Sequence, residues 1–100
     1  MDGTDYDAIV IGAGVIGAAT ALSLAWRGHR VLGLDRLPAA GYGSTSGSCA
    51  IVRPFYSTHE GVAMGWECHF YWDDWAGYLD APDAGALTRY IACGNTVVRC

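Results

Sequence analysis

The feature that most constrains this chain is a glycine-rich turn, Gly12-Ala-Gly14-Val-Ile-Gly17, between an apolar segment and a helical pattern. Residues 7–11 (DAIVI) are rich in β-branched side chains and predict a buried strand. Apolar residues then recur at helical spacing, and predict a helix over residues 15–27 that ends at Gly28. Residues 30–35 (RVLGLD) predict a second strand. We therefore expect the chain to open with a strand–helix–strand unit of the α/β class.

Each glycine of this turn has a physical task in binding a dinucleotide. Gly12 allows a tight turn out of the strand, Gly14 lets a diphosphate approach the backbone, and Gly17 lets the helix pack closely on the sheet. The unpaired N–H groups of the first helical turn and the positive end of the helix dipole would face the diphosphate. The whole turn is thus a candidate cofactor site: Gly12, Ala13, Gly14, Val15, Ile16 and Gly17.

Asp35 ends the second predicted strand, 23 residues after Gly12, close to the spacing of about twenty typical of dinucleotide-binding units. Its carboxylate is placed to accept hydrogen bonds from the ribose hydroxyls of an adenosine, and it would repel a 2′-phosphate, so NADP is the least expected ligand. The motif also fits an NAD-dependent dehydrogenase, a dinucleotide-binding module without catalysis, and a turn that binds nothing.

A loop of small residues and hydroxyls follows at residues 37–48 (LPAAGYGSTSGS). Its glycines can turn sharply or let a ligand approach the backbone. The apolar segment Cys49-Ala-Ile-Val52 comes directly after it, which is unusual for a flexible linker, so a binding loop is favoured.

A second helix is predicted from about Thr58 to Tyr78, opened by the capping-box spacing of Ser57-Thr-His-Glu60. Asp73 and Asp74 are interpreted as part of its solvated face. Its apolar stripe, interpreted as core packing, consists of Met64, Cys68, Tyr71, Trp75 and Leu79.

The last segment predicts a β-hairpin, with strands over residues 87–93 and 96–100 around the turn Gly94-Asn95. The expected organisation is therefore a cofactor-binding region over residues 1–56, a helix over residues 57–79, and the start of a further sheet, cut short, over residues 80–100.

Composition excludes several functions. The chain has 52% hydrophobic and 16% charged residues, and ten acidic against six basic residues give a net charge of −4. No basic face is available for nucleic acid, and because all six basic residues are arginine, neither a Walker A lysine nor a Schiff-base lysine exists. So many apolar residues in 100 suggest an N-terminal fragment with uncovered faces.

Four cysteines (Cys49, Cys68, Cys93 and Cys100) show no CxxC spacing, and we expect reduced thiols in a cytoplasmic protein with no metal site. Residues 8–26 are uncharged and long enough to cross a bilayer, but three glycines in their first half argue against one continuous helix. No membrane span is expected, and the acidic start lacks the basic region of a signal peptide.

Two segments carry a resemblance to a known family. The first, YDAIVIGAGVIGAATALSLAWRGHRVLGLDR (residues 6–36), closely resembles the N-terminal segment of FAD-dependent oxidoreductases of the D-amino-acid oxidase and sarcosine oxidase superfamily. The second, GSTSGSCAIVRPFYS (residues 43–57), is similar to that family's second flavin-binding segment. The resemblance implies a Rossmann-like FAD-binding domain and the oxidation of a C–N bond in an amine or amino acid, which are the expected small-molecule substrates. The hydroxyl-rich loop and the long aromatic helix after only two strands favour it over an NAD-dependent dehydrogenase.

The same resemblance implies roles for individual residues. Asp35 would hold the adenosine ribose, Arg36 would lie by the adenine, and Arg53 would bind the substrate carboxylate through two parallel hydrogen bonds. Glutamate is commoner than aspartate at position 35 in the family, and no catalytic residue is assigned. The remaining cofactor contacts would come from two groups, one near the diphosphate and ribityl chain (Gly43, Ser44, Thr45 and Ser46) and one beside the flavin ring (Cys49, Ala50 and Ile51). Cys49 is not expected to attach the flavin covalently.

Overall fold

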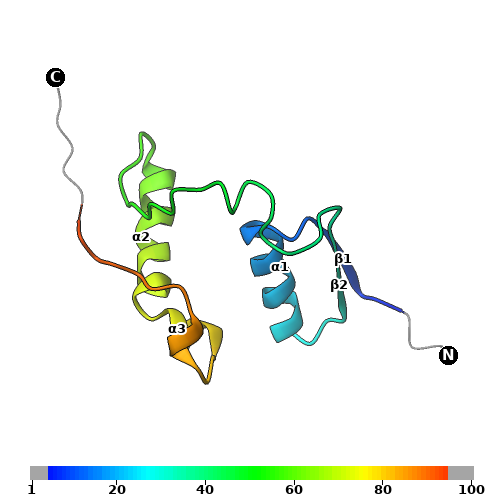
Figure 1. Cartoon of the computed structure of the whole chain (residues 1–100). Coiled ribbons are helices and arrows are strands. Elements are labelled where there is room, and N and C mark those ends of the chain that lie inside the picture. The colour runs from blue at the N-terminus through cyan, green and yellow to red at the C-terminus, as the bar shows by residue number, and fades with distance from the viewer. Residues whose placement is uncertain (1–4, 95–100) are drawn as a thin grey trace. The chain divides into compact units, whose positions relative to one another are not determined.

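The computed structural model describes residues 5–94, and the chain divides into two compact units, residues 1–49 and 50–100. The first unit contains strand β1 (Ala8–Ile11), helix α1 (Val15–Trp26) and strand β2 (Val31–Leu34) (Figure 1). The second contains helices α2 (His59–Asp73) and α3 (Trp75–Leu79) and a 3₁₀ turn, η1 (Ala84–Ala86).

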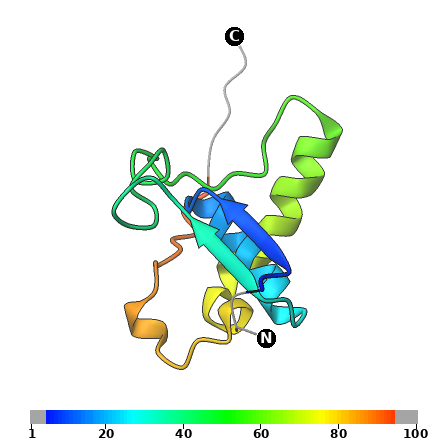
Figure 2. The same cartoon turned by 90° about the vertical axis from the view of Figure 1, so that its right-hand side faces the viewer.

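The two strands of the first unit are parallel, with Ala8 paired to Val31 and Ile11 to Leu34. Figure 2 shows the two arrows side by side, with α1 against one face of the pair. Parallel neighbours need a crossover, and α1 provides it. This β-α-β arrangement is consistent with the start of a Rossmann-like fold and confirms the predicted order of elements.

The predicted ends of α1 agree closely with the structure. The helix begins at Val15 and ends at Trp26, with Arg27 as its C-cap. Gly28 then adopts a left-handed conformation (φ +86°), and its N–H donates to the Ala25 carbonyl at 2.9 Å. A residue with a Cβ adopts this conformation only with strain, which explains why a glycine follows the C-cap residue.

The prediction of a single helix over residues 58–78 is wrong, because the helix is interrupted at Asp74 in the structure. The backbone of Asp74 leaves the helical region (φ −119°, ψ 58°), and its side chain caps the next helix by accepting from the Gly77 N–H at 3.2 Å. Aspartate is a strong N-cap residue. The Asp74 side chain, expected from the sequence to be part of a solvated face, therefore caps the start of α3 instead. At the other end of α2, the side-chain cap is Thr58, which accepts from the Gly61 N–H at 3.2 Å.

The face of α2 that is partly covered also differs from the prediction. Met64, Cys68 and Tyr71 of the expected stripe are exposed. The half-buried positions of α2 are instead Gly61, Gly65, His69 and Trp72, which recur at intervals of four, four and three. The stripe was predicted from side-chain hydrophobicity, whereas the covered face begins with two glycines that have no side chain to score.

The predicted hairpin can be compared with the structure only in part. Residues 87–94 form no strand after η1, and residues 96–100 lie outside the described residues. A strand needs a partner to complete its ladder of hydrogen bonds, and no described segment pairs with residues 87–94.

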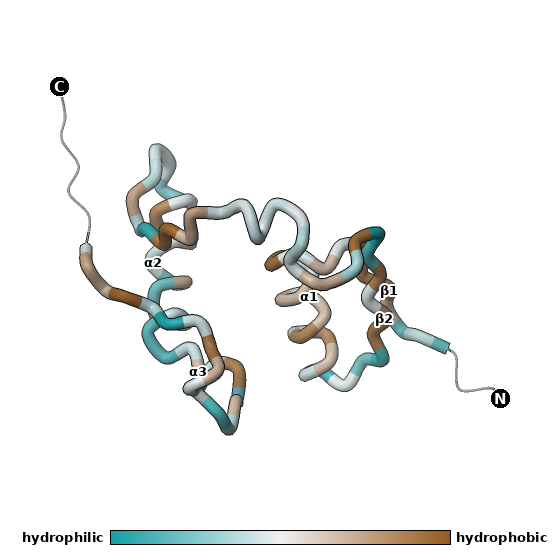
Figure 3. The backbone as a smooth tube through the Cα atoms, in the orientation of Figure 1, coloured by the Kyte–Doolittle hydropathy of each residue, from teal (hydrophilic) through white to brown (hydrophobic). Residues whose placement is uncertain are grey.

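No side chain in the described range is fully buried, and large apolar residues are exposed in both units. Ile11 and Ile16 are 86% and 80% exposed, and Ile91 is 71% exposed. Figure 3 shows hydrophobic residues along the strands and α1 as well as in the second unit. These uncovered apolar faces agree with what the composition predicts. None of the helices within residues 5–94 is long and apolar enough to cross a membrane.

Candidate functional site

The glycine turn between β1 and α1 depends on the absence of side chains at two positions. Gly12 has φ +101°, and its N–H donates to the Leu34 carbonyl at 2.7 Å. A methyl group at Gly17 would overlap the Gly12 carbonyl oxygen directly. The first turn of α1 therefore lies against the backbone that leaves β1, and only glycine at position 17 permits this approach.

Thr45 brings the hydroxyl-rich loop to the N-terminus of α1. Its Oγ1 accepts a hydrogen bond from the Val15 N–H at 3.0 Å, and a Cβ on Gly14 would lie 3.1 Å from the same atom. The N-cap residue Gly14 has no side-chain cap of its own. A second bond, from the Gly41 N–H to the Ala13 carbonyl at 2.8 Å, holds the two loops together.

Asp35 links the end of β2 to the glycine turn. Its Oδ2 accepts from the Ala13 N–H at 2.6 Å and its Oδ1 accepts from the Leu37 N–H at 2.9 Å. These hydrogen bonds, led by that from Ala13, lower the pKa of the carboxyl below its ordinary value of 3.8, and the charge of Arg36 acts in the same direction. The two carboxylate oxygens together offer about four lone-pair sites, so the group can accept from a further donor.

A cleft of about 420 Å³ opens over the glycine turn. It is lined by the end of β1, the turn itself, the first residues of α1, and Ser44 and Thr45. Within residues 5–94, no protein acceptor takes the N–H groups of Ile16 and Gly17. Two free amides at the positive end of a helix, in a cleft of this size, form a site suited to an anion such as a diphosphate.

The other predicted residues have separate positions. Gly43 and Ser46 shape the loop, since the Ser46 hydroxyl donates to the Gly43 carbonyl at 3.0 Å. Cys49 and Ile51 are exposed, and Ala50 has φ +54°. Arg53 belongs to the second unit, where its guanidinium carbon lies 5.3 Å from the centre of the Tyr56 ring. The structure thus brings together residues 12–17, Asp35, Ser44 and Thr45 within the first unit, whereas residues 50–53 belong to the second unit.

Comparison with known families decides between FAD and NAD as the cofactor. The family model for FAD-dependent oxidoreductases matches residues 7–94. The chain belongs to this family. Because the family is FAD-dependent, its cofactor is FAD rather than NAD. The residues of the turn fit that cofactor, since Gly14 adds no side chain beside Thr45 where the cleft opens, and the amides of Ile16 and Gly17 are unpaired there.

Two curated relatives each match about half of the chain. One is the monomeric sarcosine oxidase of Streptomyces avermitilis, 48% identical over 52 residues, which are 51% of this chain and 14% of the relative. The other is the D-amino acid dehydrogenase of Methylobacterium nodulans, 45% identical over 49 residues, 49% of this chain and 12% of that relative. The aligned part is thus about one-seventh of the first relative's length and one-eighth of the second's. No solved structure matches the chain significantly.

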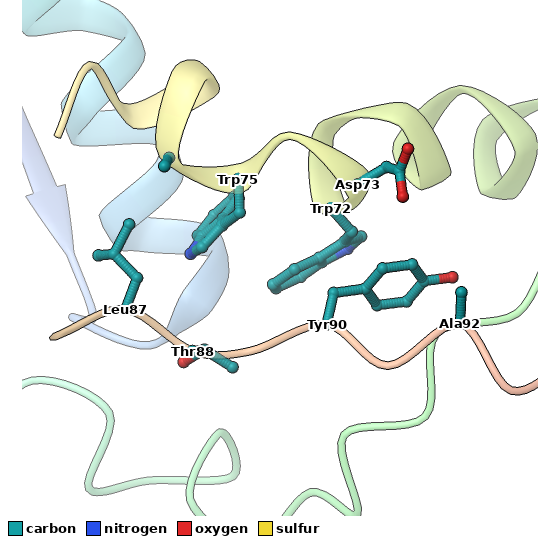
Figure 4. A pocket seen from close by; sticks show the side chains of 8 residues that line it. Trp72, Asp73, Trp75, Leu87, Thr88, Tyr90 and Ala92 are labelled. Carbon is teal, nitrogen blue, oxygen red and sulfur yellow. The ribbon is translucent and has the colours of Figure 1, made fainter. Parts of the chain in front are cut away.

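A second, smaller cleft of about 210 Å³ lies in the second unit, between the α2–α3 corner and residues 87–92. Trp72 and Trp75 stack with ring centres 4.5 Å apart, and Tyr90 comes from the opposite segment (Figure 4). The His69 Nδ1 lies 3.1 Å from the Tyr90 hydroxyl. The His69–Tyr90 contact links residues 87–92 to α2, and none of the predicted cofactor residues lines this cleft.

Proposed function

We propose that this chain provides the FAD-binding part of an enzyme that oxidises the C–N bond of an amine or amino acid. The observation that carries the proposal is the cleft over the glycine turn, where Ile16 and Gly17 present free amides in a chain of a FAD-dependent family. The names of the two relatives, an oxidase of sarcosine and a dehydrogenase of D-amino acids, support an amine or amino-acid substrate.

The diphosphate of FAD would lie over Gly12 to Gly17. The free N–H groups of Ile16 and Gly17 would donate to its oxygens, and the Thr45 hydroxyl, which accepts from Val15, retains its own hydrogen to donate as well. The ribose hydroxyls would donate to the lone pairs that Asp35 retains, with Arg36 by the adenine. The ribityl chain would lie along residues 43–46, and the flavin ring would lie beside residues 49–51.

FAD, when bound, supplies the redox chemistry by accepting a hydride from the carbon next to the substrate nitrogen. The residues of this chain bind and orient it. Arg53 would hold a substrate carboxylate, because a planar guanidinium presents two parallel donors that match the two carboxylate oxygens. Within residues 5–94, no carboxylate lies within 4 Å of this guanidinium, so it is available for a ligand.

The test is flavin reduction in the protein that carries this chain. The purified protein should show the absorption bands of bound FAD, and anaerobic addition of an amine or amino acid from a panel should bleach them. Arg53→Ala should retain the flavin but lose on the order of 10²-fold in kcat/KM for substrates with a carboxylate. A protein that binds FAD but is reduced only by substrates without a C–N bond would contradict the proposal.

A further inference from the structure

A strip without side chains runs along one face of α2, where Gly61 and Gly65 lie one turn apart. A Cβ on Gly61 would lie 2.9 Å from the Tyr56 Cβ, and a Cβ on Gly65 would lie 2.9 Å from both Tyr56 Cε2 and the Arg53 carbonyl oxygen. Real Cβ atoms do not come this close to such neighbours. The two glycines therefore form a notch into which Tyr56 and the backbone of Arg53 fit.

The Tyr56 ring lies in this notch, and the guanidinium of Arg53 lies over the ring. The Arg53 Cζ lies 5.3 Å from the ring centre, within the range of a cation–π interaction. Such an interaction uses the ring's π face and leaves the five N–H donors of arginine available. A long side chain that would otherwise sample many rotamers is thereby restricted without losing the groups that grip a carboxylate.

We infer that Tyr56 is a positioning residue for Arg53, and that the notch of Gly61 and Gly65 fixes Tyr56 in that role. The inference rests on the proposed function, in which Arg53 binds the substrate carboxylate. It gives α2 a part in substrate selection.

The first experiment measures acetate binding to the FAD-loaded protein by calorimetry. Tyr56→Leu removes the π face and should raise the Kd of acetate about fivefold, since cation–π interactions at exposed sites have modest strength. Tyr56→Phe keeps the ring and should bind acetate like the parent. Phe55→Leu is the matched control, because it removes a neighbouring aromatic ring and should leave the Kd unchanged.

The second experiment repeats Tyr56→Leu in an Arg53→Ala background. If Tyr56 acts through Arg53, the substitution should have no further effect on acetate once the guanidinium is absent. An equal loss in both backgrounds, or parent-like binding by Tyr56→Leu, would overturn the inference alone. Parent-like acetate binding by Arg53→Ala would instead contradict the substrate part of the proposed function, and the inference with it.

A third variant keeps the inference testable if Tyr56→Leu does not fold. Pentafluorophenylalanine at position 56 preserves the shape of the ring but removes the negative charge density of its face. The Kd of acetate should then rise relative to Tyr56→Phe, and turnover of an amine without a carboxylate should not change. Equal acetate binding by the phenylalanine and pentafluorophenylalanine variants would show that the ring acts only through its shape.

Discussion

The Asp35 carboxylate and the Ala13 amide are joined by a 2.6 Å hydrogen bond that connects the end of β2 to the glycine turn. The family resemblance assigns this acid to the cofactor ribose, but in the structure it first organises the protein. With the Leu37 N–H bound to its other oxygen, Asp35 holds both the glycine turn and the start of the loop that follows β2. A substitution here should therefore affect stability as well as cofactor affinity.

Asp35→Asn should lower both the thermal stability and the FAD affinity of the protein. An amide has one carbonyl oxygen, so the N–H of either Ala13 or Leu37 loses its acceptor and faces the NH₂ group of asparagine, which is itself a donor. Because the folded pKa lies below the ordinary value of 3.8, the ionised carboxyl stabilises the fold above about pH 4 and loses this contribution as the pH falls through the lowered pKa.

Melting temperatures measured from about pH 6 down to about pH 2 test this account, since the range starts well above the ordinary carboxyl pKa and extends below it. The difference between the parent and Asp35→Asn should be greatest at the upper end and shrink toward the lower end. Asp73→Asn makes the same charge change on the exposed face of α2 and serves as the control. A constant difference across the range would show that ionisation of Asp35 does not matter.

Gly17→Ala should destabilise the protein by about 1–3 kcal/mol, the range typical of overpacking. The added methyl group overlaps the Gly12 carbonyl, and because that atom belongs to the backbone, the turn must move to make room. Gly33→Ala is the matched control, because a Cβ at that position in β2 meets nothing within 4 Å. Chemical denaturation should show a clear loss for the first variant and little for the second; equal stabilities would contradict the close approach.

Thr45→Val should cost about 1 kcal/mol of stability, as for the loss of a helix N-cap, because valine keeps the shape of threonine but cannot accept from the Val15 N–H. Thr45→Ser restores the hydroxyl and should recover most of this loss. Denaturation of the FAD-free protein is the appropriate measurement, since the cofactor would add its own stabilisation. Valine and serine variants of the same stability would remove Thr45 from its capping role.

The first unit could be predicted from the sequence because its signals are local. Each signal depends only on residues close to it in the sequence. These signals are the apolar run before Gly12, the helical spacing that ends at Gly28, and Asp35 after the second apolar run. The contact between Thr45 and Val15 could not be predicted in this way, because it joins residues 30 positions apart through the path of a loop.

The second unit was less predictable because its determinants are small residues and a competing cap. Asp74 has a helical pattern on both sides, and the break is seen only in the structure, from its backbone angles and its hydrogen bond to Gly77. The Gly61-x-x-x-Gly65 spacing was visible in the sequence and predicts a close approach on one helix face. The sequence alone does not identify Tyr56 as the residue that fills it, and a hydrophobicity pattern gives glycines no weight.

The FAD content of Gly14→Val tests the central claim that the cofactor binds over the glycine turn. The valine side chain would project toward Thr45 Oγ1, which lies 3.1 Å from the position of a Cβ, and into the space assigned to the diphosphate. Gly33→Val is the control for adding the same side chain elsewhere in the unit. We predict that Gly14→Val folds but is purified colourless, while Gly33→Val retains its yellow flavin. Stoichiometric FAD in folded Gly14→Val would contradict the account.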